Sequence, residues 1–379
     1  MADAAQYSIQ RQYEILLFHY HWIVPRLGPA PDADGRPKWV SRMAQDCSPI
    51  EYAWKWNTAT SKPQISYSWE ALNPGSESCQ DPKNHRLSLQ YMNDVRRVVP
   101  HADFTVSRFF LEAIENGTRK PSNFLHAIDH GSERLELKSY LLVRDESTMN
   151  EWHDAITKLD PENPAHHALK GFLTENPEGR LFSPIVLAWD NVTPSKSRLK
   201  WYFVTRNTSF KSVREIMTMG GRLDVTEDNL QDLRSLITAI LELPADYPED
   251  QNFPLPPPAA KTWSEQENQA ETFAYYFDIA PRNGIKPDVK IYLPTRSYGP
   301  NDLAIAHHLV DWMRARGRGA YGDQYLAMLK RICDHRQLEN GKGIHSYITY
   351  QFGKNGVPDV KSYLISETYH PARFHKTQE

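Results

Sequence analysis

The residues whose spacing is most suggestive of chemistry form a repeated Lys-x-Tyr pattern. Its four copies are Lys138 with Tyr140, Lys200 with Tyr202, Lys290 with Tyr292, and Lys361 with Tyr363, and Arg198 precedes the second copy. Residues two apart in a strand share one face, so each copy would place a cation beside a phenol. A single copy is typical of a solvated strand, on which both side chains keep their polar ends in water. Four copies in similar contexts indicate one surface built from several strands.

Cations gathered on one surface repel one another and require an anion with several oxygens. A diphosphate fits, because arginine offers paired planar donors and lysines add point charges. Tyrosine hydroxyls can donate to phosphate oxygens, and their ring faces stabilise a nearby carbocation by about 2 kcal/mol each when desolvated. The pattern therefore predicts a site that could ionise an allylic diphosphate.

Glu51 is the second candidate for chemistry. In the segment 49–57 it shares a strand face with Ala53 and Lys55, so it would point the same way as the cations. An oriented carboxylate can accept a hydrogen bond from an N–H or O–H group and make an aromatic ring more electron-rich. A salt bridge to a neighbouring cation explains the same position equally well.

Five pairs of strand-like segments carry these residues. The pairs are 49–57 with 64–70, 123–129 with 134–143, 185–190 with 198–204, 274–280 with 288–294, and 346–352 with 360–365. Turn-forming residues separate the members of each pair. Helical spacing is found between the pairs, at 4–25, 85–116 (interrupted by Pro100), 148–159, 209–219, 228–243, 302–316 and 321–333. The chain thus repeats an αββα unit, and we expect a single domain over 1–379.

The two faces of the second strands differ sharply. Leu199, Trp201 and Phe203 lie opposite the Lys/Tyr face, so helices should cover the apolar side. The Lys/Tyr face would then be either the solvated face of an open sheet or the lining of a polar lumen. Closure would also remove the exposed sheet edges. We therefore predict an α+β fold, a closed ten-stranded antiparallel β-barrel ringed by α-helices.

Composition and cysteine spacing narrow the cellular compartment and the classes of ligand that the protein could bind. The net charge of −3 over 379 residues argues against a broad nucleic-acid surface. The three cysteines, Cys47, Cys79 and Cys333, lack metal-ligand spacing, which is typical of a reducing compartment and predicts no metal site. The amino terminus does not resemble a signal peptide, and no apolar run reaches membrane-spanning length. We expect a soluble, cytoplasmic monomer or homodimer that binds small molecules, with no nucleic-acid or membrane partner.

Common nucleotide and hydrolase motifs are missing from the sequence. There is no GxxxxGK[ST] loop, no GxGxxG turn between a strand and a helix, no HExxH and no GxSxG. An Asp-Asp-x-x-Asp cluster that could hold magnesium beside a diphosphate is also missing. A diphosphate site made of side-chain cations remains.

Several segments, taken in order, resemble the fungal dimethylallyltryptophan synthase family of aromatic prenyltransferases over nearly the whole chain. They are VPRLGP at 24–29, SPIEYAWKW at 48–56, LKSY at 137–140, SRLKWY at 197–202, and VKIYLPTRSYG at 289–299 followed by Asn301 and Asp302. The resemblance implies a closed ten-stranded barrel. It also implies transfer of a dimethylallyl group from its diphosphate to an aromatic acceptor, with no metal or other cofactor.

The resemblance also implies roles for individual residues. Glu51 would bind the N–H of the acceptor. The diphosphate would be held by Lys138, Arg198, Lys200 and Lys290, and the tyrosine shield would consist of Tyr140, Tyr202, Tyr292 and Tyr363. One position departs from the family pattern, because Ser66 stands where an arginine usually precedes the glutamate of the second strand by four residues. Lys62 could supply the missing cation; otherwise the phosphate grip would be weaker, or a longer donor would be repositioned.

The sequence leaves two questions open: which residue removes the proton from the prenylated ring, and which aromatic compound is the acceptor. His126 lies in the segment 123–129, and a neutral imidazole could remove the ring proton, although a core or surface histidine is the commoner role. The leading hypothesis is an enzyme that prenylates an indole or tryptophan-derived acceptor. The alternatives are an enzyme that prenylates a non-indole phenol, such as tyrosine or a polyketide, and a non-catalytic barrel that binds anionic aromatic ligands.

Overall fold

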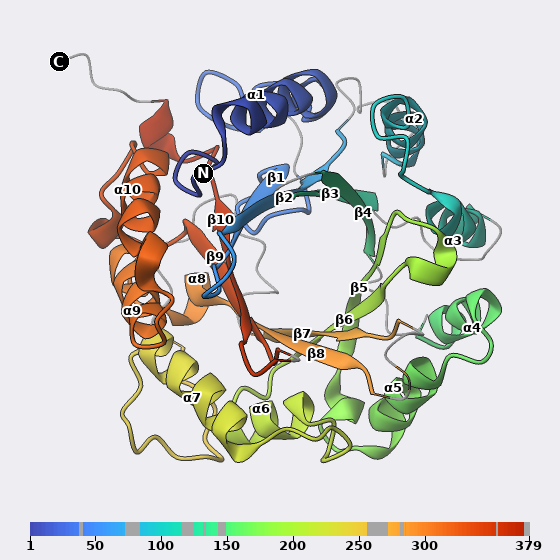
Figure 1. Cartoon of the computed structure of the whole chain (residues 1–379), viewed down its shortest axis with the longest axis vertical. Coiled ribbons are helices and arrows are strands. Elements are labelled where there is room, and N and C mark those ends of the chain that lie inside the picture. Colours follow the sequence, from blue (N-terminus) through green and yellow to red (C-terminus); the bar gives the residue numbers. More distant parts are fainter. Residues whose placement is uncertain are drawn as a thin grey trace.

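Ten antiparallel strands close into a barrel that a ring of helices surrounds (Figure 1). The computed structural model describes residues 1–37, 41–72, 84–115, 124–131, 134–142, 149–255, 272–280, 284, 286–353 and 355–374. The strands are β1 (Ile50–Lys55), β2 (Gln64–Glu70), β3 (Phe124–His130), β4 (Leu135–Leu142), β5 (Ser183–Asp190), β6 (Leu199–Thr205), β7 (Phe273–Asp278), β8 (Asp288–Leu293), β9 (His345–Gln351) and β10 (Asp359–Ile365). Each strand pairs with its sequence neighbours, and β1 pairs with β10 to close the ring. The predicted barrel is confirmed.

The helices lie outside the strands (Figure 1). They are α1 (Ile9–Phe18), α2 (His85–Val95), α3 (Thr105–Glu115), α4 (Met149–Leu159), α5 (Pro164–Glu175), α6 (Phe210–Met217), α7 (Glu227–Leu241), the short α8 (Thr295–Tyr298), α9 (Asp302–Arg314) and α10 (Gly322–Ile332). None of these helices combines the length and the apolar composition that a membrane span requires.

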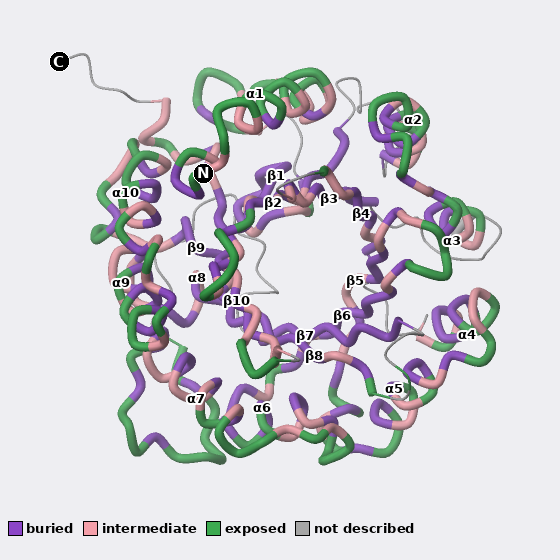
Figure 2. Tube along the Cα trace, viewed as in Figure 1, coloured by how far each residue is buried: buried purple, intermediate pink, exposed green. Residues whose placement is uncertain are grey.

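Alternation along the strands sorts the side chains between two layers. On β6, Trp201 and Phe203 point outward into the core beneath the helices, where the Trp201 ring centroid lies 4.7 Å from that of His153 on α4. Lys200 and Tyr202 on the same strand point into the lumen, and Tyr202 belongs to a separate inner cluster. Figure 2 shows the strands as a buried ring and the outer turns of the helices as exposed. The predicted assignment of faces is therefore confirmed for this strand.

Two helical regions differ from the sequence expectation. The predicted helix at 4–25 is α1 followed by a π-helical turn (His19–Ile23) and a 3-10 turn (Val24–Arg26). Helix α5 was not predicted, because His166, His167 and Gly171 weaken its intrinsic helix propensity. It forms because Asn163 caps its first turn by accepting from the backbone N–H of His166, and because Leu169, Phe172 and Leu173 are buried.

Candidate active site

The inward-facing cations gather at the end of the barrel where each hairpin turns. Lys138 lies near the start of β4, Arg198 immediately precedes β6, and Lys200 is its second residue. Lys290 and Lys361 hold the equivalent place on β8 and β10, and Lys361 pairs in register with Lys55. Lys138, Lys200 and Lys290 are each no more than 6 % exposed. Closure of the barrel therefore brings cations from five strands to one end of one lumen.

Carboxylates that sequence reasoning missed neutralise part of this charge. Asp190 accepts from Arg198 Nη2 at 3.1 Å and from Lys200 Nζ at 3.4 Å. Asp129 pairs with Lys138. Asp359 accepts from both Lys290 (2.8 Å) and Lys55 (2.6 Å). Most of these pairs join neighbouring strands, and the pair of Asp359 with Lys290 reaches from β10 past β9 to β8. The pairs fix the directions of the cations before any ligand arrives.

Burial and charge set the proton affinities at this end of the lumen. Burial lowers the pKa of Lys200 to about 8 and that of Lys361 to about 7. For Asp129, burial alone would raise the pKa, but Lys138 and Lys361 outweigh it and hold the pKa below its usual range. The carboxylates therefore remain charged, and an added anion would raise the pKa of the two lysines and favour their ammonium forms.

A continuous set of tyrosine rings lies deeper in the lumen. The ring centroids of Tyr202 and Tyr292 are 5.7 Å apart, those of Tyr292 and Tyr363 are 5.5 Å apart, and those of Tyr140 and Tyr202 are 6.3 Å apart. The Tyr292 hydroxyl lies 3.5 Å from that of Tyr202 and 3.4 Å from that of Tyr363. The structure thus brings together the four tyrosines that the repeat singled out.

Two further tyrosines extend this set. Tyr276 on β7 is the register partner of Tyr202, and its ring lies 5.6 Å from Lys290 Nζ and 6.0 Å from Lys200 Nζ. Tyr347 on β9 pairs with Tyr363. Both lie on the first strand of a hairpin, whereas the Lys-x-Tyr pattern marks only second strands. Their inward parity in the predicted strands 274–280 and 346–352 was the available sequence cue.

Glu51 lines the same cavity as the tyrosines. Its side chain is 7 % exposed, and its Oε1 accepts from the Ser346 hydroxyl at 2.6 Å. Burial raises its pKa to about 7, although the hydrogen bond from Ser346 acts in the opposite direction. The expected alternative, a salt bridge to a lumen cation, is wrong within the described part of the chain. A carboxylate that is half ionised near neutral pH is suited to accept a hydrogen bond or a proton.

The cavity itself has a mixed lining. It measures about 860 Å³ counted to its open mouth. Its apolar wall comes from β3, β4 and β5, and Arg42, Met43 and Gln45 lie along it from the segment before β1. Gln45 donates to the Tyr347 hydroxyl at 3.1 Å. One chamber therefore offers a carboxylate, a set of aromatic faces and apolar space for an acceptor.

His126 does not face this cavity, which corrects its proposed role as the base. Its parity on β3 matches the outward residues, and its ring lies 4.7 Å from Tyr91 on α2 and 5.1 Å from Trp69. It is 1 % exposed, and burial lowers its pKa to about 3. His126 is a neutral core histidine between the barrel and α2.

Lys62 does not join the cation cluster either. Its side chain is exposed, and its ammonium donates to the backbone oxygen of Gln6 at 3.1 Å. Ser66 pairs in register with Ala53 and Asp129, so it faces the lumen beside the cluster. The position that lacks the family arginine is therefore not compensated by Lys62.

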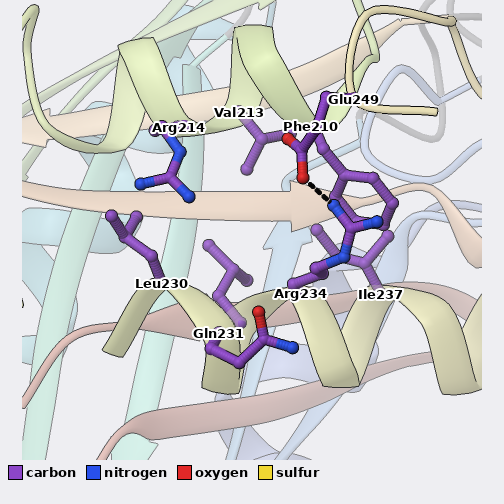
Figure 3. A pocket seen from close by; sticks show the side chains of 9 residues that line it. Phe210, Val213, Arg214, Leu230, Gln231, Arg234, Ile237 and Glu249 are labelled. Carbon is purple, nitrogen blue, oxygen red and sulfur yellow. Dashed lines mark hydrogen bonds and ion pairs between the residues drawn. The ribbon is translucent and has the colours of Figure 1, made fainter. Parts of the chain in front are cut away.

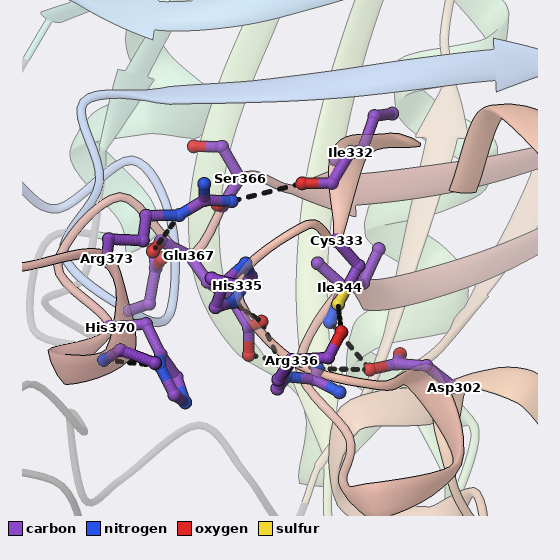
Figure 4. A network of polar contacts seen from close by, with 12 residues as sticks. Asp302, Ile332, Cys333, His335, Arg336, Ile344, Ser366, Glu367, His370 and Arg373 are labelled. Carbon is purple, nitrogen blue, oxygen red and sulfur yellow. Dashed lines mark hydrogen bonds and ion pairs between the residues drawn. The ribbon is translucent and has the colours of Figure 1, made fainter. Parts of the chain in front are cut away.

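Two other places in the fold hold clusters of polar side chains. Cys333, His335 and Glu367 have potential metal-ligand atoms within 4.8 Å of one another. Glu367 is, however, already engaged by His335 Nε2 and by Arg336 Nε, each at 2.9 Å. Figure 4 shows these residues within one polar network. Burial also raises the pKa of the Cys333 thiol to about 11, which disfavours a thiolate ligand. We interpret the group as an ion-pair network that fixes the end of β10.

The second place is a groove between α6 and α7 (Figure 3). Its two arginines are already engaged, since Arg214 pairs with Glu227, and Arg234 pairs with Glu249 and lies 3.9 Å above the Phe210 ring. These side-chain contacts hold α6 and α7 together. Among the described residues, the groove offers no group comparable with those that line the barrel lumen.

Comparison with known proteins agrees with the site. The sequence profile of the tryptophan dimethylallyltransferase family matches residues 1–328. Prenyltransferase anuH of Penicillium roqueforti is 42% identical, covering 99% of this chain and 88% of the relative. Xanthone prenyltransferase A of Emericella nidulans is 38% identical, covering 96% of this chain and 88% of the relative. The crystal structure of AnaPT from Neosartorya fischeri superposes with a TM-score of 0.79 at 18% identity, over 96% of this chain and 90% of that one.

The fold and the lumen therefore define an aromatic prenyltransferase, an enzyme rather than a passive binding barrel. The chain belongs to the tryptophan dimethylallyltransferase family. The resemblance stated from sequence motifs is confirmed. The aromatic acceptor is not fixed by these relationships, because xanthone prenyltransferases stand among the relatives.

Proposed function

We propose that this enzyme transfers a dimethylallyl group from dimethylallyl diphosphate to a hydroxylated aromatic acceptor. One observation carries the proposal: Glu51 lies in the same cavity as the tyrosine set, and the cations stand at one end of that lumen. The donor diphosphate among the cations, the tyrosine rings and the Glu51 carboxylate would therefore follow one another along the barrel axis.

The diphosphate would lie among Lys138, Arg198, Lys200 and Lys290. Its oxygens would replace carboxylate oxygens as acceptors, and the fork of Arg198 suits two phosphate oxygens at once. The allylic C–O bond would break with both electrons going to the diphosphate. The resulting cation would lie between the faces of Tyr202, Tyr292 and their neighbours, where cation–π attraction stabilises it and water is excluded.

The acceptor would place its phenolic O–H against Glu51. Withdrawal of this proton toward the carboxylate enriches the ring, whose carbon then attacks the allyl cation to form the C–C bond. The proton on the attacked carbon would pass to the departed diphosphate, and Glu51 would return the phenolic proton to the acceptor oxygen, so that an aromatic phenol and a protonated diphosphate result. Because Glu51 is the only carboxylate among the described residues that line the cavity, we propose it as the group that takes the phenolic proton.

The choice of a phenol over an indole rests on the relatives. Xanthones are the acceptors named for a 38%-identical relative that covers 96% of this chain. The family description names tryptophan instead, so an indole acceptor is the competing possibility. A carboxylate serves an O–H as well as an N–H, and the acceptor therefore has to be measured.

We further propose that the transfer needs no metal ion, because side-chain cations can neutralise the leaving diphosphate. The test is incubation with dimethylallyl diphosphate and a panel of hydroxyxanthones, simpler polyketide phenols, tyrosine and tryptophan, with and without EDTA. We expect a mass increase of one prenyl group on a phenol, unchanged by EDTA. Product from tryptophan alone would overturn the acceptor class, and magnesium-rescued loss in EDTA would overturn the metal-free mechanism.

A further inference from the structure

Ser68 on β2 faces the lumen directly beside Glu51. The two residues pair in register across β1 and β2, and both line the same cavity. The next residue on β2, Trp69, points outward, and its ring lies 4.8 Å from that of Tyr91 on α2. Residues that are directly opposite in antiparallel strands hold their Cβ atoms about 5 Å apart. The Ser68 hydroxyl and the Glu51 carboxylate can therefore contact neighbouring atoms of one ligand.

The level of Ser68 in the barrel assigns it to the acceptor rather than to the diphosphate. Ser66, on the same face of β2, lies opposite Asp129 beside the cation cluster. Two residues advance a strand by about 7 Å, so Ser68 stands one layer further from the cations. That layer also contains Glu51, which is the group that we assign to the acceptor.

The Ser68 hydroxyl is available to a ligand. Its side chain is half-buried, and it makes no hydrogen bond with any residue that the structure describes. Most other hydroxyl groups of the cavity lining already contact another side chain, namely those of Tyr202, Tyr292, Tyr363 and Tyr347. A bound molecule that pairs with the Ser68 hydroxyl would therefore displace no contact of the protein.

Glu51 keeps one carboxylate oxygen for the same ligand. Ser346 donates to Oε1 at 2.6 Å, whereas Oε2 makes no hydrogen bond within the described part of the chain, and none joins Glu51 to Ser68. The nearby wall on β3, β4 and β5 contributes apolar side chains, which are those of Leu125, Leu142, Ile185 and Val186. A carboxylate oxygen that accepts and a hydroxyl that can donate thus stand side by side at the edge of an apolar chamber.

A pair of this kind matches an aromatic acceptor that carries two neighbouring oxygens. A phenol beside a ring carbonyl holds its proton in an internal hydrogen bond to the carbonyl oxygen. When the phenol turns to a carboxylate, the carbonyl oxygen loses that bond, and an unsatisfied buried acceptor costs free energy. A serine hydroxyl removes this cost because it can donate to the carbonyl, which a carboxylate cannot do.

We propose that Ser68 is a specificity-determining residue, which donates a hydrogen bond to a carbonyl or hydroxyl oxygen adjacent to the phenol that Glu51 binds. The inference rests on the proposed function and narrows the acceptor to aromatic compounds with a phenol beside a second oxygen. Ser68 would bind that second oxygen only, so phenols without it would be prenylated independently of the Ser68 hydroxyl.

The test compares two isomeric acceptors in the presence of saturating dimethylallyl diphosphate. In 1-hydroxyxanthone the hydroxyl lies beside the ring carbonyl, and in 3-hydroxyxanthone it lies away from it. Ser68→Ala should lower kcat/KM about tenfold for the first isomer, as expected for the loss of one hydrogen bond, and leave kcat/KM for the second unchanged. Comparing the ratio of the two values between wild type and variant cancels the difference in reactivity between the isomers. Ser195→Ala, in the exposed 3-10 turn between β5 and β6, is the matched control and should behave as wild type with both isomers.

An equal loss with both isomers would overturn the proposal, because the hydroxyl would then act through Glu51 and not on the second oxygen. An unchanged ratio in a Ser68→Ala chain with the wild-type melting temperature would overturn it as well. In both cases the wild-type enzyme still prenylates phenols, so the proposed function stands. Product from tryptophan alone, with neither isomer consumed, would instead refute the proposed acceptor class, and this inference would fall with it.

Discussion

Glu51 on β1 and Ser346 on β9 are joined by a 2.6 Å hydrogen bond that reaches past the strand between them, β10. The serine hydroxyl donates to Oε1, and within the described part of the chain this is the only hydrogen bond that the Glu51 carboxylate makes. The bond orients the carboxylate along the cavity and favours its ionised form. Ser346 is therefore a positioning residue for the group that we assign to the acceptor.

The first prediction concerns the pH dependence of turnover. Burial raises the pKa of Glu51 to about 7, so the ionised carboxylate is lost as pH falls through neutrality. We expect kcat/KM to fall about tenfold per pH unit below 7 and to level off above it. Ser346→Ala removes a bond that favours ionisation, so the midpoint should move up by roughly one unit. An unmoved midpoint would contradict this coupling.

Glu51→Gln tests the same group without titration. We expect a loss of turnover of at least about a hundredfold, because the amide cannot take the acceptor proton. Dimethylallyl diphosphate should still bind, since the cation cluster is unchanged, and calorimetry with the donor alone would measure this. Equal product formation by wild type and variant would refute the assigned role.

Arg198→Lys should weaken the grip on the donor. A lysine keeps the charge but loses the planar fork, so KM for dimethylallyl diphosphate should rise roughly tenfold. Lys62→Ala is the control, because Lys62 is exposed and bonds to Gln6, and its KM should match wild type. A comparable rise in both variants would return Lys62 to the diphosphate site.

Ser66→Arg restores the cation that the family pattern places on β2. Ser66 lies opposite Asp129 in register, so an arginine there would pair with that carboxylate and release Lys138 toward the diphosphate. We expect a several-fold lower donor KM, on the order of one added charge-assisted hydrogen bond. Thr60→Arg, on the exposed β1–β2 turn, is the control for added charge. A higher KM in Ser66→Arg alone would show that the serine makes room for the donor.

Buried histidines should make the fold sensitive to acid. Burial lowers the pKa of His126, His130 and His166 to about 3 and that of His153 to about 4. Below pH 6.5, which is about the pKa of histidine in the unfolded chain, the unfolded chain binds protons that the folded chain does not bind. The free energy of unfolding therefore falls as pH drops. Each group would cost about 2 kcal/mol of unfolding free energy at pH 5.

His126→Phe should remove one of these costs, because the site is an aromatic cluster around Trp69, Tyr91 and Phe124. Urea unfolding at pH 7 and pH 5 measures the difference between the two chains. Turnover at pH 7 should be retained, whereas loss of activity in a folded variant would restore His126 as a candidate base.

The barrel could be predicted because alternation is a local property. Lys200 and Tyr202 on one face and Trp201 and Phe203 on the other specify both layers of β6 without knowledge of its neighbours. The parity of His126 could have been read in the same way, since Leu125, Ala127 and Asp129 on the inward side leave it with the outward residues. The proposed base was chosen by residue type, and strand geometry decides against it.

The ion pairs could not be predicted, because they depend on register across strands. Asp190 meets Lys200 only after the β5–β6 turn sets which residues face each other, and Asp359 meets Lys55 only after β1 and β10 close the ring. The contact between Lys62 and Gln6 likewise depends on where the amino-terminal segment returns over the β1–β2 turn.

The pairing of β1 with β10 has a consequence for biosynthesis. Glu51 leaves the ribosome early, but its partner Ser346 follows 295 residues later, and the strand that closes the ring comes after that. Throughout this interval β1 presents an unpaired edge that could recruit other chains. Such distant pairing slows folding and prolongs exposure of apolar surface. We therefore expect this enzyme to depend on chaperones during synthesis.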